Sequence, residues 1–267
     1  MSANLRPIAA VPRIALDEVD STNAEALCRL AAGETAPFWL TAGRQVAGRG
    51  RRGRSWTSEP GNLYSSLVLV EPAPAEHLGA LPLVVGLGVH RAVAGLAGLD
   101  PARLRVKWPN DVLLDGKKIA GILIEANEIA GRRTVVVGIG VNCAHHPEGT
   151  EWPATSLAAA GLAVSPDEVF ACLAGSLAAT LAEWDRGAGL AAIRRAWLDI
   201  ASGLGEPIVV RLPQSTVSGH FSTIDRDGRL VLRLASGEER RIAAGDVFLP
   251  GTGPADSGAD EARGGAA

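Results

Sequence analysis

The stretch KWPNDVLLDGKKIAGILIE, residues 107–125, decides how the middle of this 267-residue chain folds. The proline in this stretch favours extended backbone at the residue before it, so a strand over 104–108 ends just ahead of Asn110-Asp111. An Asp-Gly pair at 115–116 lies between apolar runs and predicts a hairpin whose second strand covers 119–125. The stretch therefore combines antiparallel β-structure with polar side chains placed at a strand end.

Outward from this hairpin, the sequence predicts a mixture of strands and helices. Thr22 and Glu25, like Ser165 and Glu168, have the spacing of a capping box, in which side chains and backbone at a helix start bond reciprocally. The unbroken Val/Ile content of 134–141 indicates a strand buried on both faces. Strands are expected over 14–16, 38–41, 63–70 and 134–141, and helices over 22–33, 78–98, 166–186 and 190–201.

The character of the chain changes at Gly203-Leu-Gly205. Four or five short β runs with turn signals between them follow, as far as residue 249, and this pattern is typical of a small barrel. The last residues, 251–267, contain no large apolar side chain and are expected to be disordered. We therefore divide the chain into a domain over 1–203, a small β domain over 204–250 and a tail.

The composition excludes several classes of protein. Hydrophobic residues make up 47% of the chain, too many for a disordered protein, and a net charge of -3 provides no global basic field for nucleic acid. The three cysteines are scattered, so we expect no disulfide framework and a reducing cytoplasm as the setting. No targeting segment is visible, and the longest apolar run, 78–89, is shorter than the roughly 20 residues of a bilayer span.

The segment GRGRRGR, residues 48–54, is the most unusual in the chain. Together with Arg44 it places five arginines within eleven positions, with no acidic residue before Glu59. A bound polyanion would relieve their repulsion, and the glycines let backbone N–H groups approach it. A solvated charged loop and an Arg/Gly nucleic-acid-binding loop are the alternatives. The literal G-x-G-x-x-G pattern lacks the helix of a dinucleotide fingerprint, so a phosphate-binding loop of another architecture fits better.

Lysine is rare in this chain. Only three of the 26 basic residues are lysines, at 107, 117 and 118. Either the genome favours arginine, or these positions need a compact ammonium group that arginine cannot supply. Lys107 and Lys118 on neighbouring strands would flank the same phosphates, and the oxygens of Asn110 and Asp111 suit Mg²⁺. The simpler alternatives are a turn at Asn110-Asp111 and an exposed hairpin lysine.

Three blocks in this order, GRGRRGRSW (48–56), KWPNDVLLDGKKIAGILIE (107–125) and GIGVN (138–142), resemble the signature blocks of the biotin protein ligases over roughly residues 14–250. The resemblance implies an α+β fold: a catalytic domain similar to the class II aminoacyl-tRNA synthetases, with a mixed sheet and helices, followed by a small SH3-like β-barrel. Because the catalytic signature begins by residue 20, the resemblance implies a ligase-only type without an N-terminal DNA-binding domain.

The resemblance also implies a reaction. Members of the family use ATP to activate biotin as biotinyl-5′-AMP, releasing pyrophosphate, and then transfer biotin to one lysine of a carboxyl carrier domain, such as that of acetyl-CoA carboxylase. ATP and Mg²⁺ are the implied cofactors. The implied setting is cytoplasmic, with no nucleic acid and no membrane as partners, and a homodimer is one candidate assembly. A lipoate ligase or octanoyl transferase of related fold is the alternative enzyme, and an RNA-binding module the alternative of another class.

Roles for individual residues follow from the resemblance and from the charge of the substrates. Biotin's carboxylate and ATP are both negative, so cations aimed at the reacting atoms dominate the expected chemistry. The expected catalytic residues are Lys118, Arg51, Arg49 and Asp111, the last also a candidate acceptor of the incoming lysine's proton. The expected biotin contacts are Ser21, Thr22, Asn23, Gln45, Gly48, Arg49, Arg51, Lys118, Gly121, Gly138 and Gly140. The expected ATP or adenylate contacts are Arg51, Arg52, Arg54, Trp56, Lys107, Asn110, Asp111, Lys118 and Asn142, with Asp111 also the expected ligand of Mg²⁺.

Overall fold

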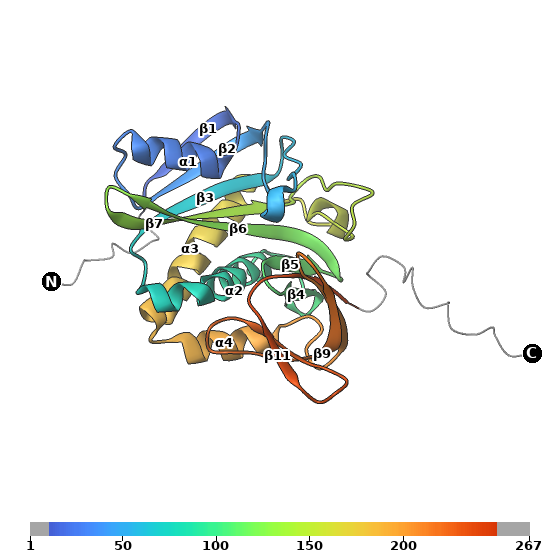
Figure 1. Ribbon diagram of the computed structural model, residues 1–267. Helices are drawn as coiled ribbons and strands as arrows, with labels where there is room; N and C mark the ends of the chain where they lie inside the picture. Colours follow the sequence, from blue (N-terminus) through green and yellow to red (C-terminus); the bar gives the residue numbers. More distant parts are fainter. Residues whose placement is uncertain (1–10, 250–267) are drawn as a thin grey trace, which may run out of the picture.

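The computed structural model describes residues 11–249. A mixed seven-stranded sheet forms the centre of its N-terminal part (Figure 1). Its order is β1-β2-β3-β7-β6-β5-β4; the edge strands β1 and β2 are parallel, and all other neighbours are antiparallel. The mixed sheet that the resemblance implied is thus present. The strands are β1 (Arg13–Val19), β2 (Phe38–Gln45), β3 (Leu63–Val70), β4 (Leu104–Lys107), β5 (Asp111–Leu114), β6 (Lys117–Ile129) and β7 (Arg132–Val141).

Helices cover both faces of this sheet (Figure 1). The strand β7 shows why: Val136 belongs to a small core with residues of α1, whereas Val135 and Val137 belong to the large core on the opposite face. Successive side chains of a strand point to opposite faces, so an unbroken valine run needs cover on both sides, as predicted for 134–141. The helices are α1 (Thr22–Ala31) on one face and α2 (Leu81–Ala94), α3 (Pro166–Trp184) and α4 (Leu190–Asp199) on the other.

The two predicted capping boxes have different outcomes. At α3 the box is confirmed: Ser165 accepts from the backbone of Glu168, whose side chain accepts from Ser165 in return. At α1 the prediction is wrong, because Ser21 is the N-cap residue and caps no backbone N–H with its side chain. Gln45 of the neighbouring β2 accepts from the Thr22 backbone N–H instead, at 2.8 Å. A residue distant in sequence therefore caps α1.

The single helix predicted over 78–98 is shorter than expected. A 3₁₀ turn over Ala75–Ala80 leads into α2, which ends at Ala94. Pro82 explains the start of α2, because proline is tolerated in the first helical turn and not in a helix interior. The combined segment Ala75–Ala94 is the one described helical segment long and apolar enough to cross a membrane, and most of it is buried inside the molecule. It is the core helix that the sequence predicted.

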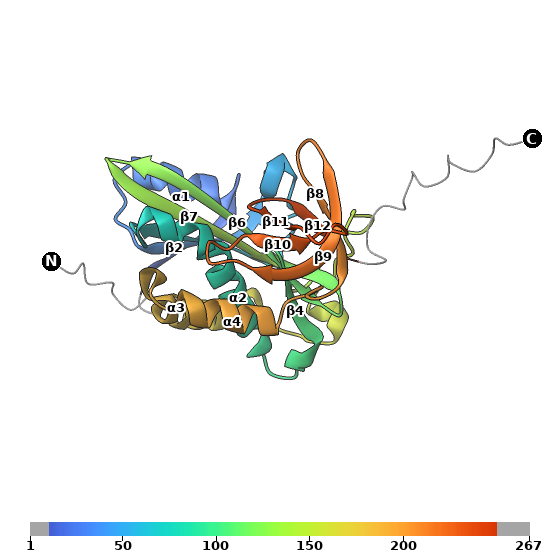
Figure 2. The same ribbon diagram turned by 60° about the horizontal axis from the view of Figure 1, so that its bottom comes forward.

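A second sheet follows α4. Its order is β11-β10-β9-β8-β12, with all neighbours antiparallel, in agreement with the predicted small β domain. Figure 2 shows it against the large sheet, with β9 next to α4. Its buried side chains, such as Phe221 and Leu230, belong to the same continuous core as α2 and α3. The strands are β8 (Pro207–Arg211), β9 (Thr216–Ile224), β10 (Leu230–Arg233), β11 (Glu239–Ile242) and β12 (Asp246–Phe248), and the tail predicted over 251–267 lies outside the described residues.

Packing between α2 and α3 makes a stability prediction. Leu177 is fully buried, and a Cβ atom on Gly88 would lie 2.9 Å from its Cδ1, so the leucine packs directly on the backbone of α2. Leu177→Ala is expected to lower the free energy of unfolding by about 2–5 kcal/mol, measured by urea titration. The exposed Ala179→Ser on the same helix is the control and should change it by less than about 0.5 kcal/mol. A loss under about 1 kcal/mol for Leu177→Ala would contradict this packing.

Candidate active site

One row of directly paired residues crosses the large sheet and forms the floor of a cavity. In register, Lys107 pairs with Asp111, Asp111 with Gly121, Gly121 with Gly140 and Gly140 with Tyr64. Directly opposed residues share a face of the sheet. A charged half, Lys107 and Asp111, therefore lies beside a glycine half, Gly121 and Gly140. The cavity of about 270 Å³ is lined by all of these residues.

The glycine half of the floor supports an indole ring. A Cβ atom on Gly121 or on Gly140 would lie 2.7 Å from the ring of Trp56, so only glycine lets the ring rest there. The Nε1 group of Trp56 is buried and has no hydrogen-bond partner among the described residues. Trp56 therefore fills the space over these two glycines and borders the rest of an apolar slot, with one donor left unsatisfied.

The polar end of the slot lies at the start of α1. Gln45 Oε1 accepts from the backbone N–H of Thr22 at 2.8 Å and from its hydroxyl at 3.2 Å, and Gln45 Nε2 donates to Ser58 Oγ at 2.9 Å. Asn23 Oδ1 accepts from Ser66 Oγ at 2.6 Å. Three of the four expected polar biotin contacts are thus already bonded within the protein, while the hydroxyl of Ser21 lines the cavity and takes no part in capping.

The charged half of the floor is built around one carboxylate. Lys118 Nζ lies 2.6 Å from Asp111 Oδ1, and Lys107 Nζ lies 3.3 Å from Asp111 Oδ2. Burial raises the pKa of Asp111, but the two ammonium groups outweigh it, so the net pKa is below its ordinary value. Burial lowers the pKa of Lys107, although Asp111 opposes that change. The site therefore holds two ammonium groups and one carboxylate in a nearly dry position.

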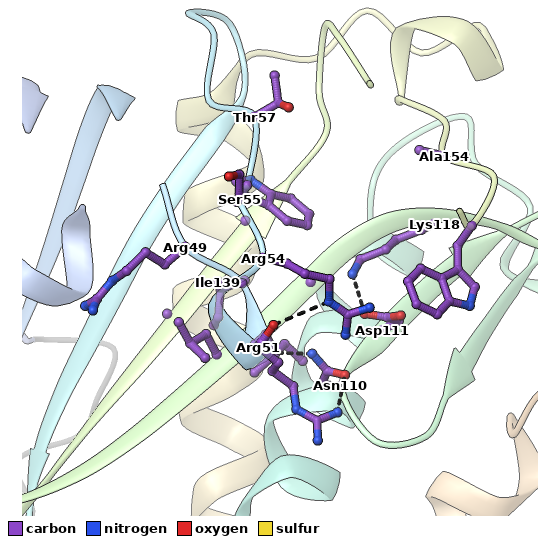
Figure 3. Close-up of a pocket in the computed structure, with 18 of the residues that line it drawn as sticks. Arg49, Arg51, Arg54, Ser55, Thr57, Asn110, Asp111, Lys118, Ile139 and Ala154 are labelled. Carbon is purple, nitrogen blue, oxygen red and sulfur yellow. Dashed lines mark hydrogen bonds and ion pairs between the residues drawn. The ribbon is translucent and has the colours of Figure 1, made fainter. Parts of the chain in front are cut away.

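The segment 48–54, which we call the arginine loop, covers this charged half. Arg51 donates to Asn110 Oδ1 at 3.1 Å and approaches Gly245 O at 3.5 Å. Burial lowers the pKa of Arg51, and the charges of Asp246 and Asp111 oppose that change. Figure 3 shows Arg51 and Arg54 beside Asn110 and Asp111, whereas Arg49 points away from them. In this conformation the guanidinium of Arg49 lies 3.6 Å from Glu125, so the structure does not place it with the other expected catalytic residues.

Asp246, at the start of β12, holds the loop to the second sheet. Its carboxylate is 7% exposed and pairs with Arg52 at 3.0 Å and with Arg54 at 2.8 Å. Arg211 of β8 lies 3.8 Å away. The self-repulsion predicted for the arginine loop is therefore relieved, in this structure, by a carboxylate of the C-terminal domain.

Of the residues expected from the sequence, only Gly48 and Arg52 do not line the cavity. A Cβ atom on Gly48 would lie 2.4 Å from the backbone oxygen of Trp56, so Gly48 lets two loop segments meet. Asn142 lines the cavity, yet its amide donates to Thr155 O at 2.9 Å and so fixes the loop beside Lys118. The remaining expected residues all line the cavity, although the guanidinium of Arg49 points away from its charged half.

The sequence did not single out Trp152, Asp246, Tyr64 or a role for Glu125. The ring of Trp152 stacks on Phe248 with centroids 5.2 Å apart, and the charged groups of Arg54 and Lys107 lie 4.7 and 5.1 Å from its centroid. No local pattern marks Trp152, because its neighbours come from distant segments. Asp246 and Tyr64 also reach the cavity only through tertiary packing, and Glu125 contacts the lining residues Asn23 and Arg49 without lining the cavity itself.

The residues present do not fit a protein-held metal ion. Both oxygens of Asp111 face ammonium groups, and Asn110 Oδ1 already accepts from Arg51. Over residues 11–249 no group of three or more His, Cys, Asp or Glu side chains is arranged to hold a metal. The expectation that Asp111 ligates Mg²⁺ therefore does not fit the geometry, because the lysines supply the positive charge that a metal would bring.

The site combines a glycine-floored slot with a cluster of cations, and a small β domain adjoins it. This arrangement suits a ligase that activates a carboxylate with a nucleotide, and the comparisons with known proteins give the family. The sequence profile of the Biotin/lipoate A/B protein ligase family matches residues 19–142, and the profile of the Biotin protein ligase C terminal domain matches residues 203–249. This chain belongs to the biotin protein ligase family, as the relatives below show.

Two curated relatives carry the same name. The biotin--[acetyl-CoA-carboxylase] ligase of Paracoccus denitrificans is 43% identical over 243 residues, covering 88% of this chain and 100% of the relative. That of Mycobacterium tuberculosis is 38% identical over 86% of each chain. Among solved structures, the biotin protein ligase of Aquifex aeolicus in complex with biotin and ATP aligns with a TM-score of 0.75 and 28% identity, over 89% of this chain and 98% of that chain.

The buried charge cluster makes a stability prediction. Asp111→Asn leaves the ammonium group of Lys107 buried without its counter-ion, and losing one partner of a buried pair costs about 3–5 kcal/mol. We expect the free energy of unfolding, from urea titration at pH 7, to fall by that amount. Asp115 lies in the same hairpin and forms an exposed ion pair with Arg103, so Asp115→Asn is the matched control. It should lower the free energy of unfolding much less.

The loss of unfolding free energy caused by Asp111→Asn should depend on pH in a definite direction. The pKa of Asp111 is lower in the folded chain than its ordinary value of about 3.9. Its stabilising contribution is therefore present above about pH 4 and is lost as the pH falls toward the folded value. The gap between wild type and Asp111→Asn should begin to shrink below about pH 4, and a gap unchanged between pH 7 and pH 3 would contradict the assignment.

Proposed function

We propose that this chain catalyses ATP-dependent biotinylation of a carrier protein. In the first step a biotin carboxylate oxygen bonds to the α-phosphorus of ATP, the bond from that phosphorus to the bridging oxygen breaks, and pyrophosphate leaves. In the second step the amine of an acceptor lysine attacks the acyl carbon, and AMP leaves. The observation that carries the proposal is the Lys107–Asp111–Lys118 cluster beside a glycine-floored slot. The names of the relatives support biotin as substrate and a carboxylase carrier as acceptor.

Charge decides the first step. A carboxylate and a triphosphate repel each other, and preorganised cations that face the developing charge are usually the largest catalytic contribution. Lys118 is the central group, since its ammonium lies at the border between the charged floor and Gly121. Asp111 fixes both ammonium groups before the substrates arrive, so no reorganisation is needed at the moment of reaction.

Biotin fits the slot in one direction. Its apolar chain would lie in the cavity beside the ring of Trp56, which itself covers Gly121 and Gly140, with the carboxylate toward Lys118 and the ureido ring toward the start of α1. The Ser21 hydroxyl is a polar group available at the start of α1, and the Nε1 of Trp56, over Gly140, is a second unsatisfied donor on the cavity wall. A site built to hydrogen-bond a polar ring rejects analogues that lack it, and lipoate has no ureido group.

ATP would occupy the side toward the second sheet. A purine would stack on the ring of Trp152 by displacing the charged groups of Arg54 and Lys107, which lie 4.7 and 5.1 Å from its centroid. Such stacking is worth roughly 1–3 kcal/mol per base. The triphosphate would then meet Arg51, Arg54 and Lys107, which line the cavity, sharing Arg54 with Asp246. Arg52, paired with Asp246 outside the lining, would have to turn to reach it. Any Mg²⁺ would be held by phosphate oxygens, which suit it as ligands, and no step of the proposal runs through it.

Asp111 is not the acceptor of the proton in the second step. Its pKa is lowered, and a weakly basic carboxylate between two ammonium groups is a poor general base. We therefore propose that Asp111 orients Lys107 and Lys118, and that the proton released as the acceptor lysine forms its amide bond passes to solvent water. A cytoplasmic setting and a homodimer stay predictions.

Pyrophosphate release tests the proposed function. Purified protein is mixed with ATP and either biotin or lipoate, without any acceptor protein. We expect release with biotin and none above background with lipoate. Release with lipoate alone would point to the lipoate branch of the family, and release with neither substrate would reject the proposal.

Lys118 gives the sharpest variant. Lys118→Ala should slow adenylate formation about 10²–10³-fold, the usual loss when one preorganised donor is removed. Lys117→Ala is the matched control, because Lys117 is the exposed neighbour in the same hairpin and should leave the rate unchanged. Single-turnover pyrophosphate release measures both. A Lys118→Ala rate within threefold of wild type would remove this residue from the mechanism.

A further inference from the structure

One carboxylate oxygen joins an amide at the polar end of the slot to a guanidinium group of the arginine loop. Glu125 Oε2 accepts a hydrogen bond from Asn23 Nδ2 at 2.7 Å, and the same oxygen lies 3.6 Å from a guanidinium nitrogen of Arg49. Glu125 lies in the long strand β6 and its side chain is 29% exposed. Its contacts therefore run inward to the cavity and outward to the arginine loop.

The inward contact sets the polar end of the slot. Asn23 is 2% exposed, and its Nδ2 donates both to Glu125 and to Leu123 O, while its Oδ1 accepts from Ser66. A Cβ atom on Gly138 would lie 2.4 Å from Asn23 Oδ1, so the amide rests directly on the floor strand. A buried amide with an unpaired N–H group is costly, so the acceptor at Glu125 helps to hold this amide in one orientation.

The outward contact anchors the start of the arginine loop. Arg49 follows Gly48 and its guanidinium turns toward Glu125, away from the charged floor (Figure 3). Arg51, two residues later, faces Asn110 instead. The loop is thus fixed at one end to β6 through Glu125 and at the other end to β12 through Asp246.

The distance from Lys118 explains how a negative charge is tolerated here. Seven residues of extended strand separate Glu125 from Lys118, on the order of 20 Å along β6. A carboxylate at that distance does not compete with the substrates' anionic groups for the Lys118 ammonium. It acts only on the polar end of the slot and on the loop that covers it.

We propose that Glu125 is a positioning residue for biotin: it orients Asn23 at the ureido end of the slot and ties Arg49, and with it the covering loop, to β6. This role rests on the proposed function, because it assumes that biotin occupies the slot. Neither contact touches the reacting atoms, so the effect belongs to biotin affinity rather than to the rate of the chemical step.

Two substitutions separate the inward and outward contacts. Glu125→Gln keeps an oxygen that can accept from Asn23 but removes the charge that faces Arg49. Glu125→Ala removes both contacts. Glu128→Gln, an exposed glutamate on the same strand, is the matched control for loss of one negative charge.

Calorimetric titration with biotin alone, without ATP, measures the affinity directly. We expect Glu125→Gln to weaken binding about two- to fivefold, the range that a half-exposed ion pair supplies. Glu125→Ala should weaken binding roughly tenfold or more, since a buried N–H group then loses its acceptor. Glu128→Gln should bind as wild type, and the thermal midpoint of Glu125→Gln should match that of Glu128→Gln.

The outcomes distinguish this role from the proposed function. Wild-type protein that does not bind biotin would reject the proposed function and this role with it. Wild-type binding together with unchanged affinity in both Glu125 variants would overturn the role alone, as would equal weakening by Glu125→Gln and Glu128→Gln.

If Glu125→Ala does not fold, a double variant of Glu125→Gln with Arg49→Gln tests the role instead. The two substitutions together should weaken biotin binding by less than the sum of their separate effects in free energy, and additive effects would overturn the coupling.

Discussion

The ion pairs of Asp111 with Lys107 and Lys118 are the interaction on which the rest of the site depends. Three charges taken out of water are tolerated only while they face one another, because an unpaired buried charge is costly. The strands β4, β5 and β6 bring them together in register, and the adjoining glycines leave room beside them. The result is a site whose cations are fixed in advance, as activation of a carboxylate by a triphosphate requires.

The arginine loop extends the same principle to the C-terminal domain. Arg52 and Arg54 would repel each other and Arg51, and Asp246 of β12 relieves that repulsion within the protein. A triphosphate offers the same kind of partner in greater number. The arginines that the proposal assigns to the nucleotide therefore also link the second sheet to the first, alongside the hydrophobic core that runs through both.

Features of the fold and site that depend on residues close together in the sequence were predictable, and those that depend on distant residues were not. The stretch 107–125 predicted its hairpin, the Ser165 box predicted the start of α3, and the signature blocks contain more than half of the residues that line the cavity. The orientation of Arg49, the capping of α1 by Gln45 and the contacts of Asp246 depend on residues far apart in sequence, so no local pattern shows them. Asp111 looked like a metal ligand because spacing alone did not show that both its oxygens would face lysines.

Lysine-selective NMR tests the central claim most directly, since the chain has only three lysines. Side-chain ammonium signals would be followed while biotin and an ATP analogue that cannot be cleaved at the α-phosphorus are added. The account predicts that the signals of Lys107 and Lys118 shift on binding, while the exposed Lys117 in the same hairpin does not. Ligand binding that leaves the signals of Lys107 and Lys118 unchanged, or that moves only Lys117, would contradict it.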